Sequence, residues 1–476
     1  MNKHKKKANR GLKSVGEDRI SELPDEIIIH ILSFLPSTKS CVKTSVLSKR
    51  WHNLWTCVPN LIFSQSHFSR FVFDEVDCLK RVVNKTLALH SFSKLNSFSI
   101  QVPDLRQLYP SIELWLQLAV KRAVESLTLD FLDIPRSPSD RPSAGYLLPQ
   151  FVYSNSHMQI LTTKFCEFVP HGRISWSALK KLSIRQSLLN DEVIQNILNG
   201  TPALENLQLI FCCGVKLLDL SSKPKLKKLV IKVNEYCLMG SDYNYELKIV
   251  GPYLETLKIL GLWGLFKCKL MKMSSLMGAT LDFGVFNDGD ESQVRRQNMA
   301  KELLENVLHA EQLKLKNHCT EALSKLRMDV LVSLSSNLKS LDVDCHGRSY
   351  LRGIERVLCC AHKLEKLVIF FNYSRSSTAK KNCHLQSEPD DYGKNYWRNA
   401  EIPSCLDSHL KTIVISGELR SRVVLEFLQF LLMNSNILEK MIVQNCFNHQ
   451  TPLRLAEKLS RYPRSSQQAL FLVDPK

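Results

Sequence analysis

Seven cationic side chains stand beside the apolar residues of a six-residue pattern, apolar-x-x-apolar-x-apolar, that recurs along this sequence. The seven are Lys181, Arg185, Lys228, Lys232, Lys258, Lys314 and Lys316. If each unit is a strand and neighbouring units pair, these cations share one face, where lysines on adjacent strands about 5 Å apart repel one another. An acidic or phosphorylated segment would relieve that repulsion through charge-assisted hydrogen bonds. We therefore interpret the seven as candidate binding residues; the alternative is a solvated strand face that discourages aggregation.

Residues that could support catalysis or hold a metal lack the spacing that such chemistry needs. The chain has 15 cysteines and 14 histidines, but it contains no Cys-x-x-Cys pair, and its histidines show no metal-ligand spacing. Gly-x-Ser-x-Gly, His-Glu-x-x-His and a Gly-rich phosphate loop are also absent from the sequence. We predict a non-catalytic protein with no catalytic residues, no metal and no cofactor, whose thiols serve mainly as small apolar groups.

The composition is that of a folded protein with a strong positive charge. Of 476 residues, 44% are apolar and 23% are charged, and the formal net charge is +18. This balance excludes a disordered or collagen-like chain and favours polyanionic partners. No run of about 18 apolar residues occurs, and no apolar segment follows the basic N-terminus. We expect an intracellular protein, in the nucleus and/or cytoplasm, with no membrane segment.

The first 16 residues form a basic leader that we expect to be disordered. Its cations are Lys3, Lys5, Lys6, Lys7, Arg10 and Lys13. Such a run is either a solvated tail or a patch for nuclear import or nucleic-acid contact.

The six-residue pattern predicts the elements that would position the seven cations. It recurs at 179, 204, 226, 254, 310, 338, 364, 410 and 438, with looser versions at 95, 124, 158 and 276. Most steps are about 21 to 34 residues, which matches or slightly exceeds a leucine-rich repeat. We predict an α/β fold, an irregular leucine-rich-repeat solenoid with a parallel β-sheet on its concave face and helices on its convex face. Helical spacing marks the return paths at 191–199, 299–309, 351–360 and 423–433.

A polar segment at 372–404 separates two repeats by 46 residues, from Leu364 to Leu410, and we predict that it is an insertion on the repeat array. Its aromatic residues Tyr392, Tyr396 and Trp397 allow two interpretations. They could form a contact loop, or some of them could pack back onto the solenoid.

The stretch SELPDEIIIHILSFLP at 21–36 predicts an unusually apolar helix near the N-terminus. Ser21 can cap it, Pro24 suits its first turn, and Asp25 and Glu26 favour the positive end of its dipole. We predict two further helices, beginning near Thr38 and at Ser48, which together with the first cannot bury all their apolar surface among themselves. This surface either docks on the first repeat as a cap or enters a groove on another protein.

Residues 17–55, EDRISELPDEIIIHILSFLPSTKSCVKTSVLSKRWHNLW, resemble an F-box. The resemblance lies in the pairs Leu23-Pro24 and Ile31-Leu32, the downstream Leu35 and the run from Ser48 to Trp51. The array behind it resembles the F-box/leucine-rich-repeat proteins, and 405–443 resemble the FBD-type repeat of the plant members. The resulting domains are a leader at 1–16, a three-helix F-box at 17–60, a solenoid at 61–404, and FBD-like repeats with a tail at 405–476.

The resemblance implies a substrate-recognition subunit of a cullin-RING, SCF-type ubiquitin ligase. The F-box would bind a Skp-type adaptor, which joins cullin and RING subunits, and the repeats would hold an unknown protein substrate through the seven cations. Carried over by position, the adaptor contacts are Leu23, Pro24, Ile28, Ile31, Leu32, Leu35, Val46 and Trp51. Some of these would also serve the core of the module. The alternative is a basic leucine-rich-repeat protein that binds nucleic acid or another polyanion, but this leaves the N-terminal apolar stripe without a purpose.

Overall fold

The computed structural model divides the chain into two compact units, Met1–Thr128 and Leu129–Lys476. It describes residues 20, 22–64, 74–91, 94–103, 106–132, 145–234, 246–262, 267–284, 290–323, 326–329, 331, 337–345, 348–371, 397, 400–417, 422–444 and 457–474. The basic leader lies outside the described residues. None of the helices within these ranges is long and apolar enough to cross a membrane.

The first unit begins with short helices and continues into the first repeats. Its elements are α1 (Asp25–Ser33), α2 (Thr38–Lys43), η1 (Thr44–Val46), η2 (Leu54–Cys57), β1 (Asn60–Ser64), α3 (Asp74–Leu89), β2 (Ser97–Pro103), η4 (Arg106–Leu108) and α4 (Tyr109–Lys121). Strands β1 and β2 are parallel, with Leu61 beside Phe98. Both side chains are buried, so the hydrophobic core of the repeats already begins directly after the N-terminal helices.

The N-terminal helices differ from the sequence prediction in their ends and in their number. Pro24 stands at the N-cap of α1 without a side-chain cap, and α1 ends at Ser33. Helix α2 is capped by Ser37, whose hydroxyl accepts from the Ser40 N–H. The short helix predicted to open at Ser48 begins later: turns lead from there into the 3-10 helix η2. The three-helix module therefore contains two α-helices, and its third segment packs against them through Trp51, Leu54 and Val58.

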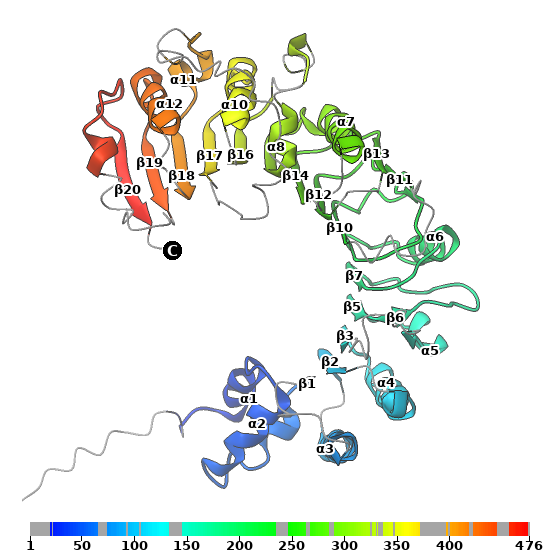
Figure 1. The fold of residues 1–476 in the computed structure, drawn as a ribbon. Coiled ribbons are helices and arrows are strands. Elements are labelled where there is room, and N and C mark those ends of the chain that lie inside the picture. Colours follow the sequence, from blue (N-terminus) through cyan, green and yellow to red (C-terminus); the bar gives the residue numbers. More distant parts are fainter. Residues whose placement is uncertain are drawn as a thin grey trace, which may run out of the picture. The chain divides into compact units, whose positions relative to one another are not determined.

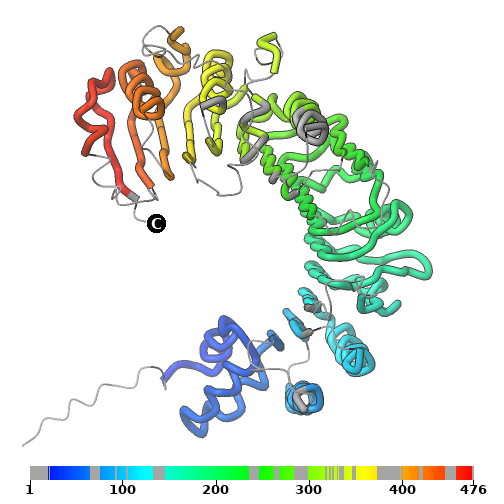
Figure 2. Tube along the Cα trace, in the orientation of Figure 1, coloured from blue at the N-terminus to red at the C-terminus, as the bar shows by residue number. Residues whose placement is uncertain are grey.

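The second unit is built on a long parallel sheet, as the repeat pattern predicts. Its strands pair in chain order: β5 (Ile160–Lys164), β7 (Lys181–Arg185), β8 (Asn206–Ile210), β10 (Lys228–Val233), β12 (Thr256–Leu262), β14 (Gly278–Gly284), β15 (Gln312–Asn317), β16 (Ser340–Cys345), β17 (Lys366–Phe371), β18 (Thr412–Gly417), β19 (Lys440–Gln444) and β20 (Leu470–Asp474). A further strand, β3 (Ser126–Leu132), spans the boundary of the units. Figure 2 shows the chain passing from each strand of the second unit to the next in order.

Alternation along each strand separates a buried face from an inner face. The second and fourth residues of the strands point into the core, as Leu182 and Ile184 do in β7. The first, third and fifth residues point to the opposite side, which we call the inner face. In Figure 1 the helices of the second unit cover the other side of this sheet. The predicted parallel sheet with helices behind it is confirmed.

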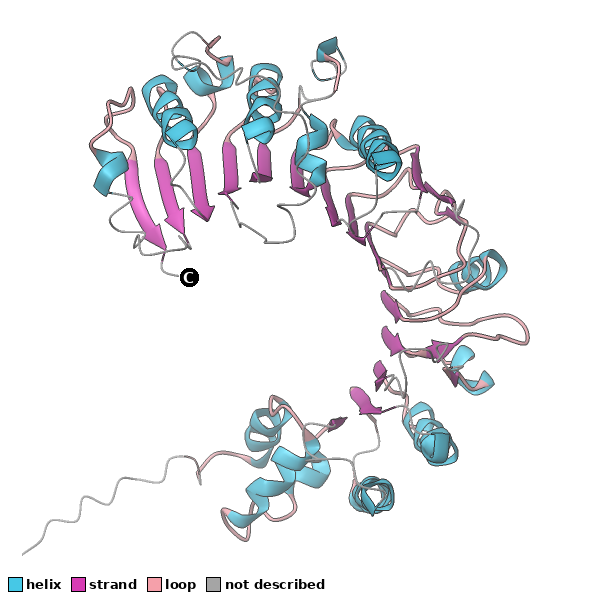
Figure 3. Ribbon diagram, viewed as in Figure 1, coloured by secondary structure: helices cyan, strands magenta, loops and turns pink. Residues whose placement is uncertain are grey.

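Helices and short strands share the outer side of the second unit (Figure 3). The helices are α5 (Gln150–Tyr153), α6 (Asp191–Asn199), α7 (Asp290–Val307), α8 (His318–Leu323), α10 (Arg348–Cys360), α11 (Ser404–Ser408) and α12 (Arg422–Asn434). The small strands are β4 (Tyr146–Leu147), β6 (Cys166–Glu167), β9 (Leu217–Asp219), β11 (Glu246–Val250) and β13 (Lys267–Met271). The helices at 191–199, 351–360 and 423–433 match the prediction, and α7 covers 299–307.

Candidate functional site

The N-terminal helices close around a small core of their own. Ile28, Leu32, Trp51, Leu54 and Val58 are at most 8% exposed and form one cluster. Leu23 and Leu35 pack against it while partly buried. Three of the predicted adaptor contacts, Ile28, Leu32 and Trp51, therefore fill the core of the module and are not available on its surface.

Beside this core, α1 and the segment after it expose apolar side chains. Ile27, Ile31 and Phe34 are 45%, 43% and 75% exposed, and their spacing of four and three residues places them on one stripe of α1 and its C-cap residue, Phe34. Val42, Val46 and Leu47 are 37%, 86% and 65% exposed. We call these six residues the outer apolar face.

Among the predicted contacts, only Ile31 and Val46 belong to the outer apolar face; Pro24 is exposed next to it. Ile27, Phe34, Val42 and Leu47 also belong to this face but were not among the predicted contacts. Their helical spacing was visible in the sequence, but the position of Trp51 decides which edge of the stripe is buried. That position depends on the turns from Ser48, which the sequence prediction assigned to a helix.

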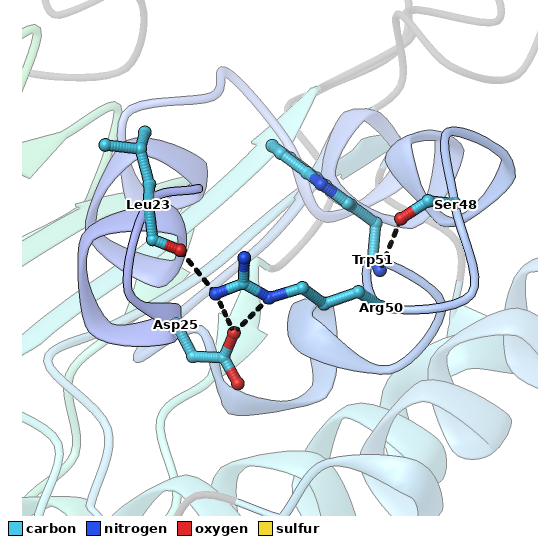
Figure 4. A network of polar contacts seen from close by, with 5 residues as sticks. All are labelled: Leu23, Asp25, Ser48, Arg50 and Trp51. Carbon is cyan, nitrogen blue, oxygen red and sulfur yellow. Dashed lines mark hydrogen bonds and ion pairs between the residues drawn. The ribbon is translucent and has the colours of Figure 1, made fainter. Parts of the chain in front are cut away.

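An ion pair fixes the start of α1 against the turn before Trp51 (Figure 4). Arg50 Nε donates to Asp25 Oδ1 at 2.7 Å, and its Nη2 donates to the Leu23 carbonyl. The Trp51 N–H lies 3.4 Å from Ser48 Oγ, a long hydrogen bond. Because Arg50 and Asp25 are partly exposed, we assign their pair a modest energy and a mainly orienting effect on the segment that carries Leu23 and Pro24.

Hydrogen bonds join these helices to the first repeat within the first unit. The Ile62 N–H donates to Thr38 Oγ1 at 2.7 Å, and Asn60 Nδ2 donates to the Ser33 carbonyl at 3.1 Å. The Cys41 thiol donates to the Leu32 carbonyl at 3.3 Å, and burial raises its pKa to about 11. The module is thus attached to β1 by polar contacts, while the outer apolar face stays exposed.

His90 adds a second attachment. Its Nε2 lies 2.8 Å from the Val58 carbonyl, and its Nδ1 lies 2.9 Å from Arg122 Nη1. These partners fit a neutral ring that donates from Nε2 and accepts at Nδ1. Burial lowers the pKa of His90, the hydrogen bond to Val58 opposes this, and the charge of Arg122 lowers it further. The neutral ring therefore joins the end of the helical module to the helices of the first repeats.

The seven predicted cations all stand on the inner face, but not as a continuous row. Lys181 and Lys228 occupy the first position of β7 and β10, with Asn206 of β8 between them. Arg185 and Lys232 occupy the fifth position of the same strands, separated by Ile210. No two of the seven share a position on adjacent strands, so the expected repulsion between neighbouring lysines is wrong.

The remaining cations differ in their surroundings. Lys258 is exposed on β12, whereas Lys314 forms an ion pair with Asp342 on the next strand. Asp344 interacts with Lys316, and burial raises the pKa of Asp344 to about 6 against that attraction. Lys232 places its ammonium 5.2 Å from the centre of the Phe211 ring. Lys314 and Lys316 are thus matched by carboxylates of this chain, which weakens the case for an anionic ligand there.

A ladder of alternating charge runs along the residues that directly precede the strands. In strand order these residues are Lys180, Glu205, Lys227, Glu255, Met277, Glu311, Lys339, Glu365, Lys411 and Glu439. Lys227 and Glu255 form an ion pair of 3.0 Å, as do Lys339 and Glu311. This rim ladder holds four lysines and five glutamates, a net charge of −1, so the excess positive charge of these strands lies on the inner face.

The polar insertion is anchored near its C-terminal end. Trp397 is 6% exposed, and its ring lies 4.7 Å from that of Phe427 and 5.4 Å from that of Phe430, both on α12. Of the two interpretations, packing back onto the solenoid holds for Trp397. Tyr392 and Tyr396 lie outside the described residues. No group of three or more potential metal ligands occurs within the part of the chain that the structure describes.

Comparison with known families identifies the parts of the chain. An F-box-like model matches residues 20–56, and the FBD model matches residues 398–443. A model described as the LRR repeats of the FBD-associated F-box protein At5g56370 matches residues 112–265. F-box/LRR-repeat protein 25 of Arabidopsis thaliana is 34% identical over 245 residues, which cover 51% of this chain and 85% of that protein. The chain belongs to the F-box/LRR-repeat family.

Other members of the F-box/LRR-repeat family match nearly the whole chain. F-box/LRR-repeat protein At3g03360 of Arabidopsis thaliana is 29% identical over 97% of this chain and 92% of its own length. F-box/LRR-repeat protein At5g02910 of the same plant is 29% identical over 90% of this chain and 88% of its own length. The resemblance seen in the sequence, including the FBD repeat, is confirmed.

Proposed function

We propose that this F-box/LRR-repeat protein is the substrate-recognition subunit of a cullin-RING, SCF-type ubiquitin ligase. Its F-box binds a Skp-type adaptor, which joins cullin and RING subunits, and its repeats hold a protein substrate. The chain then contributes binding rather than catalysis, because it raises the effective concentration of the substrate beside the transferring subunits. Its location in the nucleus and/or cytoplasm stays a prediction.

The outer apolar face carries this proposal. Exposed apolar residues scattered singly are common, but here three of them share one stripe of α1 and its C-cap and three more lie in the segment from Val42 to Leu47, next to a core that is already complete without them. A helix with such a stripe fits an apolar groove on another protein. Phe34 and Val46, the most exposed of the six, are the residues that gain most from being covered.

The test measures binding of a recombinant Skp-type adaptor to the full natural chain and to two variants of that chain. We expect Phe34→Ser/Val46→Ser to weaken adaptor binding by about tenfold or more, because each buried apolar side chain contributes about 1.5–3 kcal/mol. Leu114→Ser is the matched control, since Leu114 is 61% exposed on α4 and outside the face. Unchanged binding of the double variant, with an unchanged melting temperature, contradicts the proposal.

A further inference from the structure

The inner face changes character over its last four strands. At the third position, where β12 carries Lys258 and β15 carries Lys314, strands β17 to β20 carry only apolar residues. Phe370 extends this patch at the fifth position of β17, and Leu470 extends it at the first position of β20. We call the set the C-terminal inner patch: Val368, Phe370, Val414, Ile442, Leu470 and Leu472.

Exposure shows that this chain leaves part of the patch open. Leu470 and Leu472 are 59% and 42% exposed, and Val368, Phe370 and Ile442 are half-buried. Only Val414, between its two neighbours, is buried, at 6%. The patch is contiguous because Val368, Val414, Ile442 and Leu472 are direct register partners on successive strands.

The edges of the C-terminal inner patch differ in the charge of the residues that border them. Lys366 and Lys440 occupy the first position of β17 and β19, are both exposed, and make no ion pair with another described residue. On the β16 side stand Asp342, which is paired with Lys314, and Asp344. The rim residues Glu365, Lys411 and Glu439 alternate in sign beyond the two lysines. The edge next to the strand starts is therefore suited to acidic side chains.

The geometry favours a helix as the occupant. The sheet beneath the patch has its backbone groups paired with neighbouring strands, so it offers side chains and no free backbone donors between β17 and β20. An extended segment crossing these strands would leave its own backbone polar groups unpaired against apolar side chains, whereas a helix pairs them internally. The pitch of a helix, about 5.4 Å, is also close to the spacing of strands, about 4.8 Å.

We propose that the C-terminal inner patch binds an amphipathic helix of the substrate, with an apolar stripe laid across β17 to β20 and acidic residues on the flank that faces Lys366 and Lys440. This inference rests on the proposed function and deepens it, because it moves the substrate contact from the seven central cations to the last repeats. The two lysines stand two strands apart, about 10 Å, which matches acidic residues seven positions apart on a helix.

The test uses four labelled synthetic peptides of about 18 residues and the full chain, with binding followed by fluorescence anisotropy. One peptide has an apolar helical stripe with glutamates on one flank; the second has lysines there instead; the third is a scramble of the first; the fourth is the first with a central proline. We expect the first to bind best, and the other three to bind about tenfold more weakly.

Variants of the chain locate the site. Ile442→Ser/Leu472→Ser should weaken binding of the glutamate peptide about tenfold, since both side chains already face away from the core. Lys366→Glu/Lys440→Glu should reverse the preference toward the lysine-flanked peptide. Lys258→Ser, at the third position of β12, is the matched control and should leave binding unchanged. Melting temperatures of all variants establish that the repeats remain folded.

Four results would overturn the inference. If the scrambled peptide binds as well as the first, the patch does not recognise an apolar helical stripe. If the proline peptide binds as well as the first, the occupant is an extended segment and not a helix. If Lys258→Ser weakens peptide binding more than Ile442→Ser/Leu472→Ser does, the binding site lies at the central cations. Self-association that is lost in Ile442→Ser/Leu472→Ser makes the patch a contact between copies of this chain. Adaptor binding is measured on the same variants. If the adaptor binds but the peptides behave as above, this inference fails while the proposed function stands.

Discussion

His90 joins three segments of the first unit through one neutral imidazole. Val58 ends the helical module, His90 follows α3, and Arg122 follows α4. A proton on Nδ1 would place a positive charge against Arg122 Nη1, 2.9 Å away, and would remove the acceptor of that contact. The attachment therefore depends on keeping the ring neutral, which burial and Arg122 both favour.

The lowered pKa of His90 predicts a stability that falls in acid. The unfolded chain takes up a proton below about pH 6.5, while the folded ring resists it, so this contribution is complete above that pH and is lost below it. We expect the free energy of unfolding to fall with decreasing pH with a slope of at most about 1.4 kcal/mol per pH unit from this group. Denaturant titrations between pH 7.5 and 5.5 measure it.

The variant His90→Gln isolates the contribution of this ring from those of the other histidines, because its amide can still donate to the Val58 carbonyl but cannot be protonated. Its free energy of unfolding should fall less steeply between pH 7.5 and 5.5 than that of the natural chain. Identical slopes for the two proteins would show that His90 is not the group responsible.

Single residues also show where sequence reasoning stops. The spacing of Ile28, Ile31 and Leu32 predicts a helix with an apolar stripe, and that helix is α1. It does not tell which edge of a broad stripe is buried, since this depends on where Trp51 and Leu54 pack from a segment that is not an α-helix. Ile28 and Leu32 are therefore buried, and Ile31 is exposed.

At the scale of the element, two features of the sequence specify how the strands of the sheet are placed. Their apolar second and fourth residues place them against the core, and the rim ladder places opposite charges side by side on neighbouring strands. A shift of one repeat would bring like charges together along the ladder. The alternation of lysine and glutamate at this rim thus favours the observed order of the strands.

Reversing one charge of the rim ladder tests its contribution. Lys227→Glu places three acidic residues in succession, at 205, 227 and 255. Because Lys227 and Glu255 are partly exposed, the expected loss in free energy of unfolding is only about 0.5–1 kcal/mol at low salt. The measurement is chemical denaturation at low and high salt.

The loss should shrink in high salt, where exposed charges are screened. The double variant Lys227→Glu/Glu255→Lys restores an opposite pair at 227 and 255 but leaves acidic residues side by side at 205 and 227, so it should recover part of the stability. A single reversal that costs nothing at low salt would mean that the ladder is a pattern without energetic weight.

The elements themselves were predictable where the hydrophobic period was clear. The strands β7, β8, β10 and β12 and the helices α6, α10 and α12 follow from periods of two and of three to four residues. The small outer strands β9, β11 and β13 were not predicted, although Lys267 to Met271 alternate between exposed and buried. Short alternating segments of this kind are hard to distinguish from loops until their neighbours in space are known.

At the scale of the whole molecule, the two proposed binding surfaces belong to different compact units. The outer apolar face lies in the first unit, before the repeats begin, and the C-terminal inner patch lies on the last strands of the second. Neither includes any of the seven central cations. Separate surfaces allow an adaptor and a substrate to bind at the same time, as a recognition subunit requires.

The most direct test of the central claim is calorimetric titration of the full chain with a recombinant Skp-type adaptor at several temperatures. Covering the outer apolar face removes apolar surface from water, so the account predicts a one-to-one complex whose binding enthalpy becomes more negative as temperature rises. This dependence should be smaller in Ile31→Ser/Val46→Ser. A folded chain that does not bind the adaptor, or a temperature dependence that the double variant leaves unchanged, would contradict it.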